Sequence, residues 1–214
     1  LPQMLYYFLA YKALKPSLDN SEKELVFSVP SGNFGNICAG MVAREMGLPV
    51  THFIAATNAN KVVPNFMKNG TYQAEKSVAT ISNAMDVGDP SNFVRILQMN
   101  QNEHSILEKG LSAYSYTDQE TKEAMRTIAQ EYSYTADPHG AIGYLGLLEY
   151  QKDHPNTYGV FLETAHPVKF LEVVEETLGK TLTIPTKIVE VLSKHTQATK
   201  ISDYQGLKSF LMQE

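Results

Sequence analysis

Residues 31–36, which read Ser-Gly-Asn-Phe-Gly-Asn, have the types and spacing that suit the binding of an anion. An apolar, β-branched run precedes them at 25–29, and a helical pattern follows at 37–46. A glycine loop between a strand and a helix directs free backbone amides, and the positive end of the helix dipole, at a ligand. We therefore predict an anion site here, with the side chains of Asn33 and Asn36 as further donors.

The groups missing from this loop narrow the choice of anion. It lacks the third glycine of the dinucleotide-binding pattern. No Asp or Glu occurs between Met46 and Ala74, where such a site places the acid that holds the ribose. The Gly-Lys-Ser/Thr of a nucleoside-triphosphate loop is also missing. A small phosphate monoester fits best, and a tight turn that binds nothing is the alternative that the spacing leaves open.

A second polar loop, residues 82–93, offers more groups for a phosphate. Ser82 and Asn83 carry neutral hydrogen-bonding groups, and Arg95 carries a planar fork that suits phosphate oxygens. An Asp-Pro pair inside this loop is typical of a helix start. We therefore expect a helix at 91–99 whose first amides lie near the ligand.

These loops need a sheet to hold them in place. Apolar runs at 25–29, 50–55 and 158–162 are typical of buried strands, and helical patterns lie between them. This alternation predicts the α/β class: an open, mostly parallel twisted sheet flanked by helices, in a single domain, 1–214. Polar residues follow the strands at their carboxyl ends, which is where such sheets bind ligands.

Two helix starts are clearly marked in the second half of the chain. Thr117-Asp-Gln-Glu is a capping box that opens a helix to about Tyr132, and Asp137-Pro opens an apolar helix at 142–150. His139 falls at the start of the second of these helices. We interpret it as a structural hydrogen-bonding residue rather than as an acid or base.

The composition excludes several classes of protein. Of 214 residues, 43% are hydrophobic and 19% are charged, as in ordinary globular proteins, and no apolar run approaches the length of a membrane span. The 18 Lys and Arg against 23 Asp and Glu disfavour a nucleic-acid or membrane partner. The lone Cys38 suits a reducing, cytoplasmic location and is expected to be a packed residue, and the sequence has no metal-binding spacing.

Several blocks of the sequence occur together, and in the same order, in one known family. The loop with its flanks, Val-Pro-Ser-Gly-Asn-Phe-Gly-Asn-Ile, resembles the phosphate loop of threonine synthases, which are pyridoxal-phosphate enzymes of the tryptophan-synthase-β type (fold type II). The likeness covers nearly the whole chain. The other matching blocks are Leu1-Pro-Gln-Met, Ala55-Ala-Thr-Asn-Ala-Asn, Ile81-Ser-Asn-Ala-Met-Asp-Val-Gly-Asp-Pro-Ser-Asn-Phe and Thr164-Ala-His-Pro.

The resemblance implies roles for particular residues. The cofactor would be pyridoxal 5′-phosphate, with Thr164 facing the nitrogen of its ring. Glu163 departs from the family, which usually has a small residue there, and strand alternation predicts that Glu163 and Thr164 point in opposite directions. The phosphate of the cofactor would be bound by Gly32, Asn33, Phe34, Gly35 and Asn36, and the phosphate of the substrate by Ser82, Asn83 and Arg95.

The same resemblance implies a reaction that this chain cannot complete alone. Threonine synthases convert O-phospho-L-homoserine and water to L-threonine and phosphate, and they need a Schiff-base lysine. In the family that lysine precedes the phosphate loop, whereas Lys68 and Lys169 follow it in the wrong context. Leu1 also begins within a helical pattern. We therefore expect the C-terminal half of a lyase that is inactive without its N-terminal half.

Two other functions remain open at this stage. One is another pyridoxal-phosphate lyase, such as a serine/threonine dehydratase, although its glycine loop would normally contain more consecutive glycines. The other is a non-catalytic module that binds a phosphorylated small molecule at the glycine loop and needs no lysine.

Overall fold

A computed structural model describes residues 2–212 of the chain, so Leu1 and residues 213–214 lie outside the description, as does the side chain of Leu192. The predicted first helix and the first matching block both include Leu1, and that part of each prediction is not described. The chain forms two compact units, Leu1–Thr181 and Leu182–Glu214. Among the described residues, no helix is long and apolar enough to cross a membrane.

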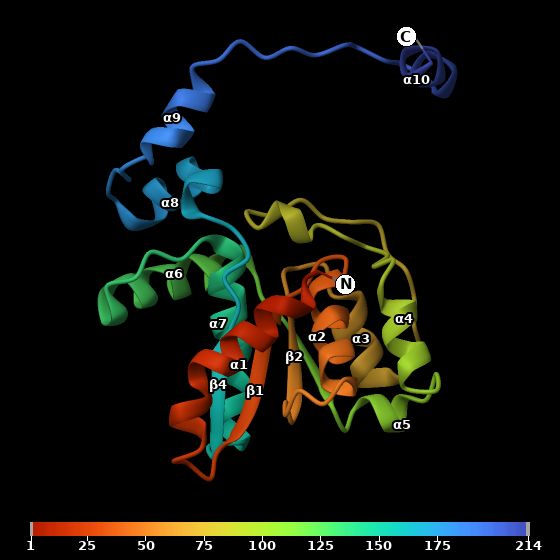
Figure 1. Ribbon diagram of the computed structural model, residues 1–214, viewed down its shortest axis with the longest axis vertical. Helices are drawn as coiled ribbons and strands as arrows, with labels where there is room; N and C mark the ends of the chain where they lie inside the picture. The colour runs from red at the N-terminus through yellow and green to blue at the C-terminus, as the bar shows by residue number, and fades with distance from the viewer. Residues whose placement is uncertain (1, 213–214) are drawn as a thin grey trace. The chain divides into compact units, whose positions relative to one another are not determined.

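A parallel sheet organises the first unit (Figure 1). Its strands are β1 (Glu24–Pro30), β2 (His52–Thr57), β3 (Leu111–Ser115) and β4 (Thr157–Phe161), in the order β3-β2-β1-β4. All three pairings are parallel. The predicted α/β class is therefore confirmed.

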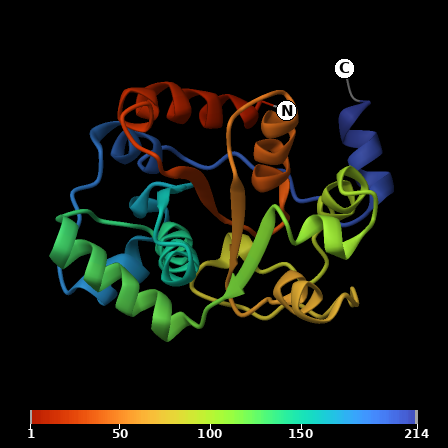
Figure 2. The ribbon, with the colours of Figure 1, turned by 90° about the horizontal axis from the view of Figure 1, so that it is seen from below.

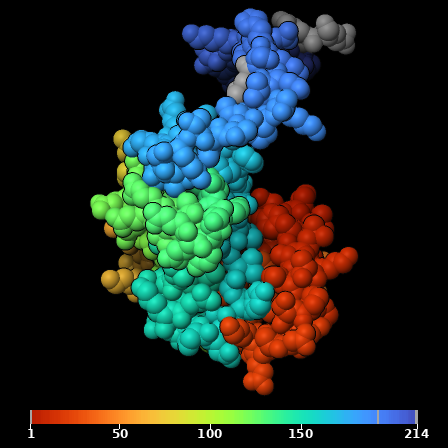
Figure 3. Space-filling view, turned by 90° about the vertical axis from the view of Figure 1, so that its left-hand side faces the viewer, coloured from red at the N-terminus to blue at the C-terminus, as the bar shows by residue number. Residues whose placement is uncertain are grey.

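Helices cover both faces of this sheet (Figure 2). One face carries α1 and α2, and the other carries α7, against which α6 packs. Figure 3 shows the region of α7 and β4 between α6 and α1. The helices of the first unit are α1 (Met4–Leu18), α2 (Gly35–Glu45), α3 (Val62–Asn69), α4 (Phe93–Met99), α5 (His104–Leu107), α6 (Asp118–Tyr132), α7 (Pro138–Asp153) and α8 (Leu171–Leu178), with 3-10 turns η1 (Asn83–Met85) and η2 (Pro167–Phe170).

The second unit contains α9 (Thr186–Leu192) and α10 (Tyr204–Leu211). Asp203 caps α10 by accepting a hydrogen bond from the backbone N–H of Gly206 at 2.7 Å. Several large apolar residues of α10 are exposed, including Leu207 and Phe210.

Alternate residues of β1 build a core on each side of the sheet. Phe27 faces α1, where its ring meets that of Tyr7 with centroids 5.1 Å apart. Val26 lies in the opposite cluster with Leu147 and Tyr150 of α7. Because both faces are covered, β1 is buried along nearly its whole length, which is why its sequence is a continuous apolar run.

The order of the strands fixes where a ligand can bind. From β1 the chain moves outward to β2 and β3, and it returns to place β4 on the other side of β1. The loops that follow β1 and β4 therefore both start at the carboxyl end of the sheet and run in opposite directions. Parallel sheets bind ligands in the crevice at such a switch point.

The helix predicted at 91–99 begins later than expected. The structure starts α4 at Phe93, and Asn92 rather than Asp89 precedes it. The carboxylate of Asp89 instead accepts a hydrogen bond from the Tyr72 hydroxyl at 2.8 Å. The predicted capping box of α6 is confirmed, because Thr117 and Glu120 exchange hydrogen bonds between side chain and backbone.

Candidate functional site

The loops after β1 and β4 line one cavity of about 690 Å³. All six residues predicted to hold the cofactor lie on its wall, although Thr164 is separated from the glycine loop by more than half of the chain. The cavity residues from the prediction are Gly32, Asn33, Phe34, Gly35, Asn36 and Thr164. The structure thus brings the predicted cofactor residues together at the switch point of the sheet.

The glycine loop is held in one tight conformation. Phe34 has a left-handed backbone, with φ 60° and ψ 15°, directly before α2. A residue other than glycine is uncommon in this region and costs on the order of 1 kcal/mol or more. The buried ring of Phe34 packs against Phe93, with centroids 5.5 Å apart, and this contact stabilises the turn.

Gly32 has no room for a side chain. A Cβ atom there would lie 2.7 Å from the Cα of Met85 and 2.9 Å from the carbonyl oxygen of Ala84. We expected Gly32 to leave room for a ligand, but the space beside it is occupied by the backbone of η1.

The two asparagines of the loop bind protein groups. The side-chain oxygen of Asn33 accepts hydrogen bonds from the backbone N–H and hydroxyl of Ser91, at 2.6 and 2.9 Å. The side-chain amide of Asn36 donates to the carbonyl of Pro30 at 2.8 Å. These bonds fix the loop and use the donor that we had assigned to Asn36.

Backbone amides and the side-chain NH2 of Asn33 are therefore the available anion donors. Gly35 and Asn36 are the first two residues of α2, and their N–H groups have no acceptor among the described residues. Unpaired amides and the helix dipole at this position favour a bound anion.

The expected opposite orientation of Glu163 and Thr164 rested on strand alternation and stays a prediction. β4 ends at Phe161, so the strand alternation has stopped before these residues. Both of them line the cavity.

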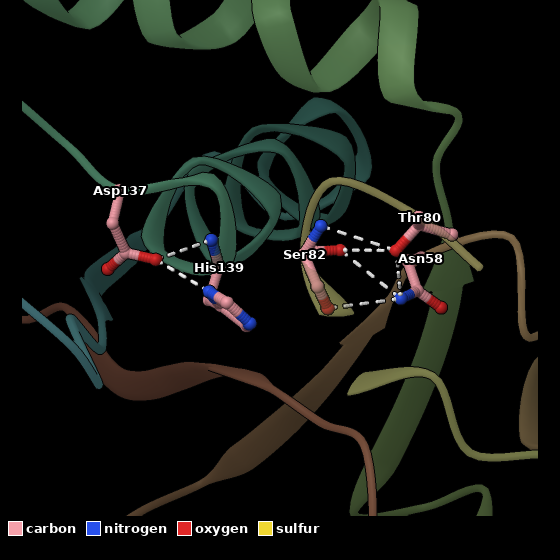
Figure 4. Close-up of polar contacts among 5 residues, drawn as sticks. All are labelled: Asn58, Thr80, Ser82, Asp137 and His139. Atoms are coloured by element: carbon pink, nitrogen blue, oxygen red, sulfur yellow. Dashed lines mark hydrogen bonds and ion pairs between the residues drawn. The ribbon is translucent and has the colours of Figure 1, made fainter. Parts of the chain in front are cut away.

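His139 is a cavity residue that sequence reasoning left as structural. Its ring Nδ1 lies 2.7 Å from Oδ1 of Asp137, and its backbone N–H donates to the same oxygen at 2.8 Å (Figure 4). An ionised carboxylate only accepts, so Nδ1 carries a proton and Nε2 is left as the acceptor. His139 is 2% exposed, it lines the cavity, and its Nε2 has no partner among the described residues.

A carboxyl group also reaches this wall. Both oxygens of Glu163 are buried. Burial, followed by the neighbouring Asp137, raises the pKa of Glu163 to about 9. Both causes favour the neutral form of Glu163. The sequence contained one signal for it, namely its departure from the small residue usual in the family.

The three residues predicted to hold the substrate phosphate are not brought together. Ser82 is buried, and its hydroxyl contacts Thr80 and Asn58, each at 3.2 Å (Figure 4). Asn83 lines a different depression, and Nη1 of Arg95 donates to the side chain of Asn92 at 2.7 Å. These assignments stay predictions.

Cys38 lies in α2, the helix that follows the glycine loop. Cys38 is a free, buried cysteine, and burial raises the pKa of its thiol. It is therefore the packed residue that we expected. Within residues 2–212, no cluster of His, Cys, Asp and Glu could hold a metal ion.

The fold and the cavity define an α/β protein with a cavity, suited to a small anionic ligand, at the switch point of a parallel sheet. A family model described as pyridoxal-phosphate dependent enzyme matches residues 8–162. The chain therefore belongs to the pyridoxal-phosphate-dependent enzyme family, and this confirms the predicted class of cofactor. A second model, described as threonine synthase, C-terminal, matches residues 140–211.

Curated relatives agree with this result. The chain is 40% identical to threonine synthase of Escherichia coli, with 99% of this chain and 48% of that protein covered. It is 42% identical to threonine synthase of Serratia marcescens, with the same coverage. The chain thus spans about half the length of the relatives it matches, and the predicted resemblance is confirmed.

Solved structures give the same answer. The threonine synthase of Escherichia coli superposes with a TM-score of 0.85 at 39% identity, covering 98% of this chain and 48% of that one. The threonine synthase with bound PLP from Brucella melitensis gives 0.86 at 29% identity, covering 99% and 50%. Threonine deaminase isoform 2 from Solanum lycopersicum, at 16% identity and a TM-score of 0.58 over 83% of this chain and 46% of that one, shares the fold alone.

Proposed function

We propose that this chain is the C-terminal, phosphate-binding part of a threonine synthase, which converts O-phospho-L-homoserine and water to L-threonine and phosphate. The main support for this proposal is the cavity that both the glycine loop and Thr164 line. The likeness to threonine synthases over 99% of the chain supports this substrate. The single buried Cys38 suits a reducing compartment, and we extend the proposal to the cytoplasm.

The residues of the cavity fit pyridoxal phosphate. The unpaired amides of Gly35 and Asn36 suit its phosphate group. The hydroxyl of Thr164, which also lines the cavity, suits the ring nitrogen as a neutral partner. A volume of about 690 Å³ is sufficient for a small cofactor and its substrate.

Bound pyridoxal phosphate supplies the electron sink for the carbanion chemistry of this family. The chain supplies orientation and a proton-carrying group. The glycine loop holds the phosphate end, and Thr164 orients the ring. Asp137 fixes the tautomer of His139, so that Nε2 can accept or return a proton inside the cavity.

The lysine that would join the cofactor has no candidate on the described wall of this cavity. Lys68 lies in the last turn of α3, and Lys169 lines a separate depression. We therefore propose that the lysine comes from the N-terminal half of the enzyme, outside these 214 residues, and that the chain alone has no turnover.

A reconstitution assay tests this function. Phosphate release from O-phospho-L-homoserine would be measured with the chain alone, and with the chain plus the N-terminal half of a similar threonine synthase and pyridoxal phosphate. We expect release only from the mixture. Release by the chain alone would contradict the proposed origin of the lysine.

The same assay separates the two alternatives. A mixture that deaminates L-serine or L-threonine but releases no phosphate would identify a dehydratase. A chain that binds pyridoxal phosphate yet gives no turnover in any mixture would be the non-catalytic module.

A further inference from the structure

Three carboxylate oxygens are buried beside the cavity, and none of them has a well-formed hydrogen bond among the described residues. They are Oδ2 of Asp137 and both side-chain oxygens of Glu163. An ionised carboxylate can only accept hydrogen bonds, so two ionised groups cannot satisfy one another. Burying such unpaired charges is costly, and a single proton shared between the two groups removes most of the cost.

The surroundings decide which of the two carboxyl groups holds the proton. Burial alone acts to raise the pKa of Asp137, but hydrogen bonds from His139 and Glu163 outweigh it, and the pKa of Asp137 is lowered. Glu163 lacks the bonds from His139, and its pKa is raised. The proton therefore belongs to Glu163.

We propose that Glu163 stands in the cavity as a neutral acid that donates its O–H to Asp137, and that this neutral state is what admits the phosphate-bearing ligand. The part of this inference that concerns the ligand rests on the proposed function. The role of Glu163 is electrostatic, since a carboxylate at the same place would repel a phosphate.

Gly140 gives Glu163 its position. A Cβ atom on Gly140 would overlap the carboxyl group of Glu163, so the space left by the glycine is filled by the acid. Gly140 lies in the first turn of α7, close to Asp137, which caps that helix. The contact brings the two carboxyl groups together.

The other groups around Glu163 do not neutralise it. Asp137, which caps α7, lies beside it through both its side chain and its backbone, and Tyr134 lies on the preceding segment. Burial, and then the charges of Glu163 and Asp137, raise the pKa of the Tyr134 phenol, which adds no positive charge. Among the described residues, no Lys or Arg forms an ion pair with either carboxyl group.

The consequence is a change of affinity with pH. Glu163 loses its proton as the pH rises through about 9, and the cavity then gains a negative charge. If only the neutral form accepts an anion, affinity should fall by up to about tenfold per pH unit above that value. The phosphate of the ligand is already ionised there, because the second pKa of a phosphate monoester is about 6.

The first experiment needs no ligand. The full 214-residue chain and its Glu163→Gln variant would be compared by infrared spectroscopy at about neutral pH. The wild type should show the carbonyl band of one protonated carboxyl group that the variant lacks, and this band should vanish as the pH rises through about 9. An ionised Glu163 at neutral pH would overturn the proton-sharing pair.

The second experiment measures the affinity for 4-deoxypyridoxine 5′-phosphate, which has no aldehyde and cannot bond to a lysine. The wild type should lose affinity above about pH 9, whereas Glu163→Gln, whose amide donates to Asp137 permanently, should not. Gly140→Ala should weaken binding, because it displaces the acid. Glu172→Gln, at an exposed position on α8, is the matched control and should follow the wild type.

These outcomes separate the inference from the proposed function. Parallel loss of affinity in the wild type and Glu163→Gln would overturn the role of Glu163, even with the cofactor site intact. A protonated Glu163 in a chain that binds no probe at any pH would refute the part that concerns the ligand and the cofactor site together.

Discussion

His52 shows how burial of a single residue makes stability depend on pH. It is buried in β2, its ring stacks on Tyr150 at 4.7 Å, and its Nε2 lies 2.9 Å from the hydroxyl of Ser112. Burial is the main cause that lowers the pKa of His52 to about 4, and a hydrogen bond to the backbone of Lys109 only partly offsets it. The folded chain therefore keeps this ring neutral in mild acid.

We predict that the free energy of unfolding falls as the pH drops from about 6.5 to about 4. In this window the unfolded chain binds a proton at His52 that the folded chain does not, so acid favours unfolding. The loss should be on the order of 3 kcal/mol, at about 1.4 kcal/mol per pKa unit. Urea titrations at several pH values would measure it.

The comparison variant is His52→Gln, which should remove most of this slope. His195→Gln, at an exposed position in the second unit, should retain it. An unchanged slope in His52→Gln would show that other groups govern the acid sensitivity.

At this scale, the sequence predicted residues whose role depends on local spacing. The glycine loop was found because Gly32 and Gly35 stand next to a strand and a helix start. Glu163 and His139 were noted but not assigned to the site, because their approach depends on β4 lying beside β1 and on Gly140 leaving room. No local pattern encodes either condition.

Among the elements, α7 comes closest to the sheet. The hydroxyl of Ser28 in β1 donates to the carbonyl of Gly143 in α7 at 2.6 Å. A Cβ atom on Gly146 would lie 2.8 Å from the Cβ of Ala56. The small residues of α7 thus allow helix and strands to meet with no side chain between them.

We therefore expect Gly146→Ala to destabilise the chain by about 1–3 kcal/mol, as overpacking does in a close-packed core. The gain in helix propensity, up to about 1 kcal/mol, would only partly offset this cost. Thermal unfolding would measure the change. Leu148→Ala, at an exposed position on the same helix, should cost less, and equal effects would contradict the close contact.

Element types were easier to predict than their ends. The strands β1, β2 and β4 were expected within two residues of their bounds, because continuous apolar runs mark strands buried on both faces. Strand β3 was missed, since only its first residue, Leu111, is fully buried and the rest has no clear pattern. The start of α4 was misjudged because Asp89 binds Tyr72 instead of a helix end.

At the scale of the whole molecule, residues 2–181 contain the sheet and the complete described wall of the cavity. We predict that a chain ending at Thr181 still unfolds cooperatively and still binds 4-deoxypyridoxine 5′-phosphate with an affinity within about threefold, or 0.7 kcal/mol, of the full chain. Circular dichroism and equilibrium titration would check this. Loss of cooperative unfolding would show that the second unit is needed for the fold.

The alternation of strand and helix patterns predicted the α/β class, the resemblance predicted the family, and neither depended on knowing the order of the strands. The order itself was not predictable from the sequence read alone, because nothing local states that β4 returns to β1. Pairings between strands far apart in sequence are set by the fit of the whole core, as in the contact of Ser28 with Gly143, 115 residues later.

That late return of β4 has a consequence for synthesis. A growing polypeptide can form the glycine loop early, but the cavity residues Glu163 and Thr164 leave the ribosome only after β4. Contacts between such distant segments form slowly. Nascent chains that stop before residue 157 should therefore not retain a vitamin-derived phosphate. Binding of the cofactor can stabilise only a polypeptide whose last strand has joined the sheet.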